Sequence, residues 1–374
     1  MKAGWPLLAV VAWCAGLAAP APVRAEDGRF YGMLRERDLT PFGFLRLDMR
    51  PAHAVNIEPH TFAFEMSLGY QNTWALSRNV ERYLVGRESQ GRRGIGAEDL
   101  EAIRDLPGEN YLLDLESATL DLGVHYKLSS QWTLYAFATA VSYHGGFMDS
   151  TIETFHDTFG FSSFGRPAVA RDSFNIIMDL KRAQMTLLDA PDKQGFTDPI
   201  FGLRYSGISL PGRWEMSMEA AAKVPLQGER LLLSTGRTDY GMQASFRRLG
   251  ERNAFHVDLA GVYYAGEDRP APHDAQVIPT VVLGWEHILT GRTNLNLQAY
   301  ASTSVYDKDD TDLAELLSEK FQLSLGIRHR LECCLMTFAI TENLQNLNNT
   351  PDVGFQLGFS WVPRIEPEQP SPEQ

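Results

Sequence analysis

The sequence predicts an all-β fold, a transmembrane antiparallel up-and-down β-barrel of about twelve strands with long outer loops and short periplasmic turns. The first observation is an alternation: from Thr61 to Trp361, segments of about ten residues carry an apolar side chain at every second position. The second is that the breaks between these segments are alternately short and long. Because side chains alternate between the two faces of a strand, each segment has one apolar and one polar face. Such faces suit a barrel with lipid outside and a polar lumen inside.

Twelve strands account for the alternation. In the first of them, Phe62, Phe64 and Met66 alternate with Ala63 and Glu65. The predicted strands are residues 61–74, 115–128, 132–143, 201–209, 213–226, 239–248, 254–264, 277–288, 293–305, 320–331, 334–342 and 352–361. Nearly all have the roughly 9–11 residues that a tilted spanning strand needs. Bacterial barrels have short periplasmic turns and long outer loops, as this spacing requires, so we predict a barrel domain over residues 61–362.

Other segments lie outside the strand pattern. Residues 1–25 have a charged start, a short apolar run and Val23-Arg24-Ala25 before Glu26, which is typical of a cleaved signal peptide. Residues 26–60 form either a periplasmic segment, with a partial strand, or a segment that rests in the barrel lumen. Residues 144–200 are too long for a bare loop and must contain structure of their own. Residues 363–374 are rich in Pro and Glu and predict a disordered tail.

The charge and the cysteine content of the chain exclude some classes of partner and of fold. The chain has 34 Lys and Arg against 47 Asp and Glu, and the predicted signal peptide removes Lys2 and Arg24, so the net charge becomes 32 − 47 = −15. An acidic protein of this kind does not suit nucleic acid, which needs a basic surface. Beyond residue 25, only the adjacent Cys333 and Cys334 remain, which excludes a disulfide-built domain. We therefore predict the bacterial cell outer membrane as the location.

The tryptophans give an independent indication of a membrane. Trp and Tyr prefer the boundary between lipid and water, because the ring is apolar while its N–H or O–H needs water. The five tryptophans beyond the signal peptide fall at or near predicted strand ends, and we expect all of them at the membrane interface. These residues are Trp74, Trp132, Trp214, Trp285 and Trp361.

The polar face of each strand predicts which side chains line the lumen. Besides Arg213, the ionisable residues on it are Glu65, Asp121, His125, Lys127, Arg204, Glu215, Glu219, Lys223, Arg247, His256, Asp258, Glu286, Arg328 and Arg330. Without the histidines and with Arg213, seven are positive and six negative. An ion-selective pore would carry an excess of one sign. The near balance instead predicts ion pairs that line or partly fill a modest lumen.

Two blocks of sequence resemble a bacterial outer-membrane family catalogued as domain of unknown function 3187 (DUF3187). The first block is Phe147–Gly160 followed by Gly165-Arg166, and the second is Thr341–Leu344 followed by Asn349–Phe355. The resemblance extends over most of the chain beyond the signal peptide, with a weaker match at Leu34–Ala54. It implies an outer-membrane barrel without an assigned activity. The strand end Ala222–Gly228 is also similar to barrels proposed to pass aromatic or other hydrophobic compounds.

No residue set in the sequence predicts catalysis, a cofactor or a bound metal. Ser142 and His144 share a strand face, but a serine hydrolase also needs a group that orients the base. Glu153 and His156 match half of a di-iron motif, which needs two copies. They lie on a predicted helix, Met148–Phe159, whose apolar face we expect to pack on the barrel rim or mouth. The acidic loop 307–315 could bind calcium, although a solvated loop explains it as well.

The expected function follows from the barrel rather than from a motif. We expect a non-enzymatic barrel that passes or binds a small solute. The alternatives are a structural or surface-interaction barrel with a closed lumen, and an outer-membrane lipid hydrolase. The expected partners are outer-membrane lipid, lipopolysaccharide and the barrel-assembly machinery. The basic first loop, with Arg78, Arg82, Arg87, Arg92 and Arg93, would face lipopolysaccharide phosphates or simply be solvated.

Overall fold

The computed structural model describes residues 28–37, 45–51, 57–180, 185–187, 193–226, 228, 230, 232–266, 275–345 and 352–361. The predicted signal peptide (1–25) and the predicted tail (363–374) lie outside the described residues. Among the described helices, none is long and apolar enough to cross a membrane.

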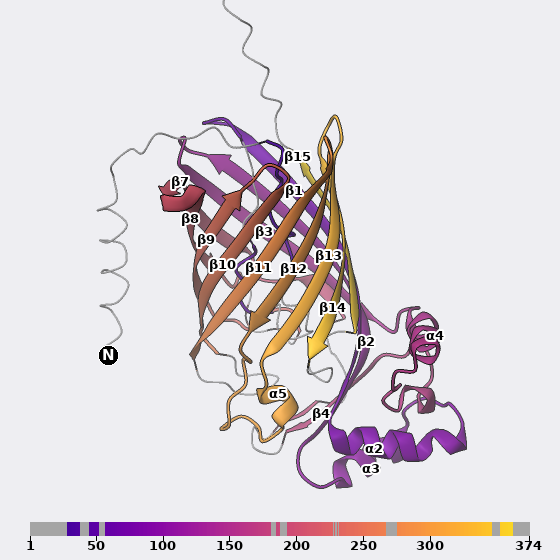
Figure 1. Cartoon of the computed structure of the whole chain (residues 1–374). Helices are drawn as coiled ribbons and strands as arrows, with labels where there is room; N and C mark the ends of the chain where they lie inside the picture. The colour runs from indigo at the N-terminus through magenta and orange to yellow at the C-terminus, as the bar shows by residue number, and fades with distance from the viewer. Residues whose placement is uncertain are drawn as a thin grey trace, which may run out of the picture.

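Twelve antiparallel strands close into a barrel, as the alternation predicts (Figure 1). They are β1 (Phe62–Leu76), β2 (Asn110–Lys127), β3 (Trp132–His144), β7 (Ile200–Leu210), β8 (Trp214–Lys223), β9 (Asp239–Leu249), β10 (Asn253–Tyr264), β11 (Gln276–Thr290), β12 (Thr293–Ser302), β13 (Lys320–Arg330), β14 (Leu335–Gln345) and β15 (Val353–Trp361). Each strand pairs with its neighbours in the chain order, and β15 closes the ring by pairing with β1, Leu357 opposite Leu68.

The connections divide the barrel into two ends. At the turn end, consecutive strands are joined by a few residues, such as 250–252 between β9 and β10. At the loop end, the connections are longer and contain the helices. The strand β2 begins at Asn110, earlier than the predicted residue 115, because its first residues extend beyond the barrel and pair with the short strand β4 (Asn175–Leu180). Two further short strands, β5 (Met185–Leu187) and β6 (Gln194–Phe196), lie in the same long loop.

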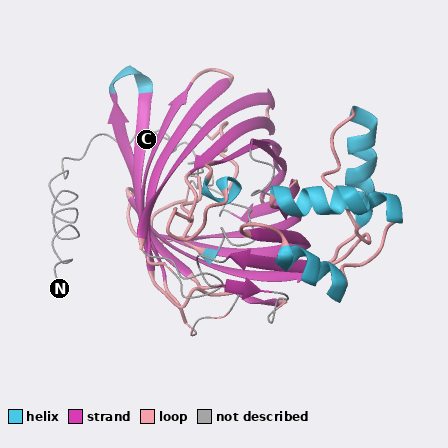
Figure 2. Ribbon diagram, turned by 90° about the horizontal axis from the view of Figure 1, so that it is seen from below, coloured by secondary structure: helices cyan, strands magenta, loops and turns pink. Residues whose placement is uncertain are grey.

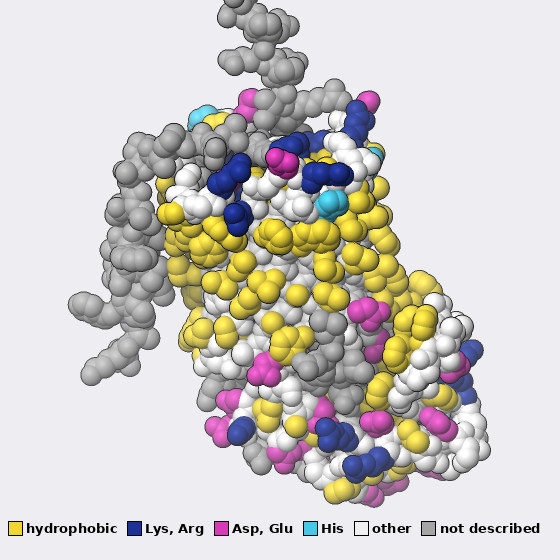
Figure 3. Space-filling view, viewed as in Figure 1, with side chains coloured by type: hydrophobic (Ala, Val, Ile, Leu, Met, Phe, Trp, Pro, Cys, Tyr) yellow, Lys and Arg dark blue, Asp and Glu magenta, His cyan; other side chains and the backbone are white. Residues whose placement is uncertain are grey.

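An apolar belt surrounds the outside of the barrel between charged ends (Figure 3). Its residues occupy alternate positions and are large and exposed, for example Phe64 at 53 %, Leu122 at 45 % and Leu297 at 40 % exposure. The intervening side chains, such as Asp121 and Gln298, point inward and are buried. Exposed apolar patches of this size mark contact with lipid or another apolar surface, so the belt is the expected lipid-facing surface.

A helical lobe sits beside the barrel at the loop end. It contains α2 (Arg78–Arg87), η2 (Glu88–Gln90), α3 (Ala97–Asp105), α4 (Asp149–Phe159) and η3 (Arg166–Ala168). Its core joins Val80, Leu84 and Ile103 to Leu76 and Trp74 on β1. The lobe thus covers the outward face of β1 where this strand leaves the barrel.

The lobe changes two expectations. Trp74 is only 3 % exposed and donates its indole N–H to the Phe164 carbonyl at 3.2 Å, so the prediction that it lies at the membrane interface is wrong. Helix α4 is present as predicted, but its apolar face is only partly buried. Met148 and Ile152 are buried, whereas Phe155 and Phe159 are 49 % and 64 % exposed.

An apolar core closes much of the barrel at its loop end. Inward residues of the strands, such as Leu115, Val141 and Tyr143, meet loop residues Leu232 and Leu233. The short helix α5 (Ala314–Leu317) contributes Leu316 to the same core. Figure 2, seen from this end, shows loops crossing the ring of strands.

Candidate functional site: the filled lumen

Residues near the N-terminus of the chain lie inside the barrel. We call residues 28–37 and 45–51 the lumen segment. Leu34, Leu47 and Tyr31 are at most 2 % exposed although they belong to no strand of the barrel wall. The lumen segment therefore forms the inner layer of a site whose outer layer is the barrel wall.

Near the turn end, side chains of the wall bind the main chain of the lumen segment. Glu286 on β11 accepts hydrogen bonds from the amides of Tyr31 and Gly32, at 2.7 and 3.0 Å. Arg328 on β13 donates to the Tyr31 carbonyl and, at 3.1 Å, to the Met33 carbonyl. These main-chain groups are buried, and buried main-chain polar groups need such partners.

In the middle of the barrel, ion pairs join the lumen segment to the wall. Arg50 and Arg37 lie 2.8 and 3.4 Å from the Asp121 carboxylate on β2. Arg35 lies 3.5 Å from Glu65 on β1 and also donates to the Pro51 carbonyl at 2.7 Å, which links the two runs of the lumen segment. Buried charges of this kind are tolerable only when paired.

Towards the loop end, one lysine and one aspartate bind the second run. Lys223 on β8 donates to the Leu45 carbonyl at 2.8 Å and lies 2.9 Å from Asp239 on β9. Asp239 in turn accepts from the Leu47 amide at 2.9 Å. The charged side chains thus contact the lumen segment at three heights along the barrel.

Inward-facing glycines make room for the apolar side chains of the lumen segment. A Cβ at Gly326 would lie 2.7 Å from Leu34, and a Cβ at Gly241 would lie 2.6 Å from the Met49 sulfur. Gly284 is in the same relation to Met33, at 2.9 Å. Real Cβ atoms do not approach this closely, so a larger residue at these positions would force the contacting side chain of the lumen segment to move.

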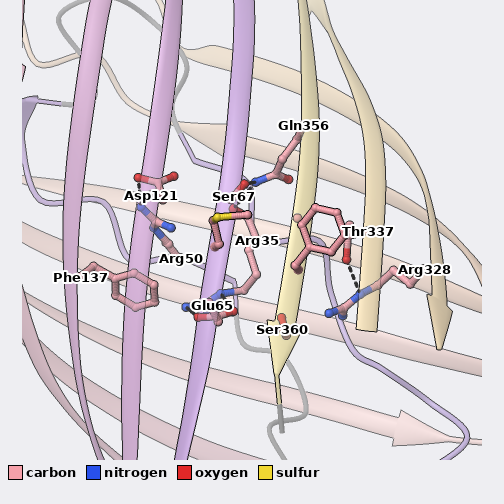
Figure 4. Close-up of a pocket in the computed structure, with 13 residues that line it drawn as sticks. Arg35, Arg50, Glu65, Ser67, Asp121, Phe137, Arg328, Thr337, Gln356 and Ser360 are labelled. Carbon is pink, nitrogen blue, oxygen red and sulfur yellow. Dashed lines mark hydrogen bonds and ion pairs between the residues drawn. The ribbon is translucent and has the colours of Figure 1, made fainter. Parts of the chain in front are cut away.

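Small cavities lie between the described residues of the lumen segment and the wall. The cavity in Figure 4, beside Arg35, Arg50 and Arg328, has a volume of about 20 Å³. Two more cavities beside Arg35 measure about 10 and 30 Å³. Since one water needs about 10–15 Å³, each holds only one or two waters. The lumen lined by these described residues is therefore narrow in this state.

The structure places most of the predicted lumen residues inside the barrel. Asp121, His125, Arg204, Glu219, Lys223, His256, Asp258, Glu286 and Arg328 are all buried. Within the wall itself, His125 pairs with Glu65 at 2.7 Å, Arg204 with Glu219 at 2.6 Å, His256 with Glu286 at 3.4 Å and Glu215 with Arg247 at 2.7 Å.

Glu65, Glu215 and Arg247 are half-buried, and three other predicted lumen residues are less enclosed because they lie where strands end. Lys127 is half-buried, and Arg330 is exposed, with its guanidinium 4.9 Å from the centre of the Tyr31 ring. Arg213 lies in the turn η4 (Pro211–Arg213) and is exposed, so its assignment to the lumen is wrong.

The sequence analysis left open whether residues 26–60 rest in the lumen, and it did not predict which of their side chains form the inner layer of the site. No alternating pattern places the charged side chains of the inner layer in a strand, and their partners come from five or more strands. These side chains are Arg35, Glu36, Arg37 and Arg50. The inward glycines were the available signal: Gly241, Gly284 and Gly326 fall on the polar face of strands, where a side chain would otherwise fill the lumen.

The remaining predicted interface tryptophans are half-buried on the outward face near the turn end. These are Trp132, Trp214, Trp285 and Trp361. The indole N–H of Trp285 donates to Asn253 at 3.1 Å, and the Trp132 ring packs 4.8 Å from Tyr205.

The other residue sets considered for chemistry do not form reactive sites among the described residues. His144 packs against Tyr70, with ring centres 5.5 Å apart, and no hydrogen bond joins it to Ser142. Glu153 binds Arg92 and Arg171, each at 2.6 Å. In the acidic loop, Asp307 accepts from the Asp309 amide. No group of three or more ligating side chains placed to hold a metal ion was found in the described parts of the chain.

The basic first loop is only partly available to phosphates. Arg87 is 3 % exposed and is bound by Asp99 and the Ala168 carbonyl, so it cannot face lipopolysaccharide as we expected. Arg93 also binds Asp99, at 2.6 Å, while Arg78 keeps a 72 % exposed side chain.

The two sequence blocks with a family resemblance meet at Arg166. This buried guanidinium lies 2.6 Å from Asp149 and also binds Asp352 and Asn72. It stacks over the Trp74 ring at 4.9 Å. Because Asp149 begins α4 and Asp352 precedes β15, the two motifs fix the helical lobe to the barrel wall rather than form a catalytic centre.

Comparison with known proteins gives a family and a fold. A family model described as protein of unknown function (DUF3187) matches residues 107–362. No curated protein matches the chain. The COG4313 outer membrane channel from Pseudomonas putida F1 superposes with a TM-score of 0.51 at 11 % identity, covering 84 % of this chain and 99 % of that one. The P. putida toluene transporter TodX has a TM-score of 0.39 at 9 % identity, covering 82 % and 91 %. At these identities the likeness concerns the fold.

Proposed function

Because the chain belongs to the family described as protein of unknown function (DUF3187), its family brings no activity with it, and we propose from the filled lumen that it is an outer-membrane channel gated by its own N-terminal residues. The observation that carries this proposal is the lumen segment, which is bound to the wall by polar contacts at three heights and also packs against it through Met33, Leu47 and Met49. A small solute passes when the lumen segment moves away from the wall.

Polar contacts favour a movable segment over a permanent strut. The wall binds the lumen segment through Glu286, Arg328, Asp121 and Lys223. Water can replace each of these hydrogen bonds, so each one adds only a small net free energy to the attachment of the lumen segment. An apolar core of the same size would have no such replacement and would resist displacement.

The loop end favours an apolar solute over an ion. A solute that enters from outside meets the apolar core with Val141, Tyr143 and Leu233 before it reaches the charged layer around Arg35. The charges beside this core, Lys223 and Asp239, already pair with each other, so an ion would lose hydration there without gaining a free partner. We therefore propose a small apolar or aromatic solute as the cargo.

A reversible lock on the lumen segment tests the gate. A Cβ at residue 241 would lie 3.0 Å from the Met49 Cγ, which is the place of a cysteine sulfur at residue 49. In a disulfide, the Cβ of one cysteine lies about 3 Å from the sulfur of the other. Gly241→Cys and Met49→Cys, with Cys333→Ser and Cys334→Ser, should therefore form a bond that ties the lumen segment to β9.

The gate predicts that the oxidised protein is closed and the reduced protein is open to its cargo. Vesicles with the full-length protein should take up a small aromatic compound only after reduction, and the Cys333→Ser/Cys334→Ser protein should be insensitive to the reductant. Equal uptake in both redox states would refute a moving lumen segment.

A closed structural barrel is the second candidate, and the water-sized cavities favour it. Under this alternative, neither redox state passes any solute and the lumen segment is a permanent filling. Absence of uptake in the reduced protein, with the band of a folded barrel on unboiled gels, would support this candidate and remove the channel.

A further inference from the structure

One edge of α4 carries an aromatic cluster that no described residue covers. Phe155, Phe159 and Phe161 are 49 %, 64 % and 57 % exposed. Their rings nevertheless contact one another, with centres 4.7 Å apart for Phe155 and Phe159 and 5.9 Å apart for Phe155 and Phe161. We call these three residues the aromatic edge.

The aromatic edge is not needed to attach α4 to the lobe. The helix is anchored by Ile152, which is buried, by Asp149, which binds Arg166, and by Glu153, which binds Arg92 and Arg171. Asp149 and Glu153 lie on a neighbouring side of the helix, whereas Ile152 precedes Phe155 and Phe159 on the same side, because each residue turns by about 100°. The aromatic edge therefore has a different partner.

The lipid-facing belt continues onto α4. Leu68, 45 % exposed, belongs to the belt on β1, and Tyr70 follows it on the same outward face. The Tyr70 ring lies 5.1 Å from that of Phe147, which is 69 % exposed and immediately precedes α4. Figure 1 shows α4 beside the barrel, above α2 and α3. An apolar path thus runs from the belt to the helix.

Cationic side chains flank the same helix. The Arg171 and Arg92 side chains keep 49 % and 29 % exposure while they bind Glu153. Both arginines belong to segments that pack against α4, and the helix itself carries no Lys or Arg. Partly exposed arginines also suit phosphate groups.

We propose that α4 lies in the outer leaflet of the outer membrane and that its aromatic edge binds the acyl chains of the phosphorylated glycolipid there, the lipid A part of lipopolysaccharide. The continuity from Leu68 through Tyr70 and Phe147 supports lipid as the occupant. The helical lobe then works as a lipid anchor at the loop end, whether or not a solute passes through the lumen.

Site-specific photocrosslinking in outer membranes tests this contact. Benzoylphenylalanine is placed in full-length protein at residue 155 or 159, and at residue 157 as the matched control. Asp157 is exposed but lies on the opposite side of α4 from Phe155 and Phe159. All three proteins must show the heat-modifiable band of a folded barrel before they are irradiated.

The proposal predicts that the proteins with benzoylphenylalanine at residue 155 or 159 give a crosslinked product that reacts with an antibody to lipid A. The protein with benzoylphenylalanine at residue 157 should give no such product. A product at twice the mass of the chain would show that a second copy covers the aromatic edge and would overturn the proposal. Equal lipid A signal at residues 157 and 159, or none at any of them, would overturn it as well.

Discussion

The ion pair between Arg204 and Glu219 gives the sharpest test of the filled lumen. The two residues are register partners on β7 and β8, and their side chains are 8 % and 3 % exposed. The Arg204 Nε lies 2.6 Å from the Glu219 carboxylate. Glu219→Ala removes the carboxylate and leaves a buried guanidinium with no neutralising partner in direct contact.

The expected cost is large because the charge cannot return to water. Breaking a buried ion pair from one side costs about 3–5 kcal/mol, which lowers the folding equilibrium constant about 150- to 5,000-fold. Glu215, four residues earlier on β8, is the matched control. It pairs with Arg247 in a partly exposed setting, with 25 % and 23 % side-chain exposure, so Glu215→Ala should cost about 0–1 kcal/mol.

Urea unfolding of the refolded protein in lipid vesicles, followed by tryptophan fluorescence, measures both variants. The double change Glu219→Leu/Arg204→Met should recover much of the stability lost in Glu219→Ala, because it removes both charges. Equal losses for Glu219→Ala and Glu215→Ala, or no recovery in the double variant, would refute a dry, ion-paired lumen.

Four further predictions concern other parts of the molecule. Leu297→Arg on the belt should lower the free energy of unfolding in vesicles by about 2–4 kcal/mol, and Leu289→Arg near the turn end by about 0–1 kcal/mol, since the penalty falls with distance from the bilayer midplane. Equal losses would show that the belt is not centred in the membrane. Gly241→Leu should displace Met49 and raise uptake in vesicles relative to Gly241→Ala, and lower uptake would contradict the gate. Arg166→Met should make the helical lobe more sensitive to protease, whereas Arg171→Met, at an exposed residue, should change cleavage little. Similar cleavage in both variants would show that Arg166 does not hold the lobe to the barrel. Burial raises the pKa of Asp99, but hydrogen bonds from Gly96, Tyr83, Arg87 and Arg93 outweigh burial and hold the pKa well below its usual range. The stability that the Asp99 carboxylate adds is therefore complete above the unfolded-state pKa of about 3.9 and is lost as the pH falls below that value. Protease resistance of the lobe that declines between pH 7 and 5 in wild type but not in Asp99→Asn would contradict this prediction.

The barrel itself could be predicted from the sequence because each strand reports its own environment. Lipid on one side and protein on the other impose alternation within about ten residues, so Phe62–Tyr70 or Trp214–Lys223 reveal their faces without knowledge of the rest of the chain. The turn and loop lengths then give the two ends. For the same reason, the alternation alone predicted which residues of the barrel wall, including Glu219, Lys223 and Glu286, face the lumen.

The contents of the lumen were decided only by the tertiary structure. The lumen segment has no regular strand alternation of its own that identifies its partners. Asp121 and Arg328 are about 200 residues apart in the chain, so only the closed ring brings these partners together. Trp74 and Phe155 show the same limit from the other side. Both have the position that their local pattern predicts, but whether a side chain faces lipid, water or protein depends on what the helical lobe covers: it buries Trp74 and leaves Phe155 exposed. A periodic pattern fixes the direction of a side chain, and long-range packing fixes what it meets there.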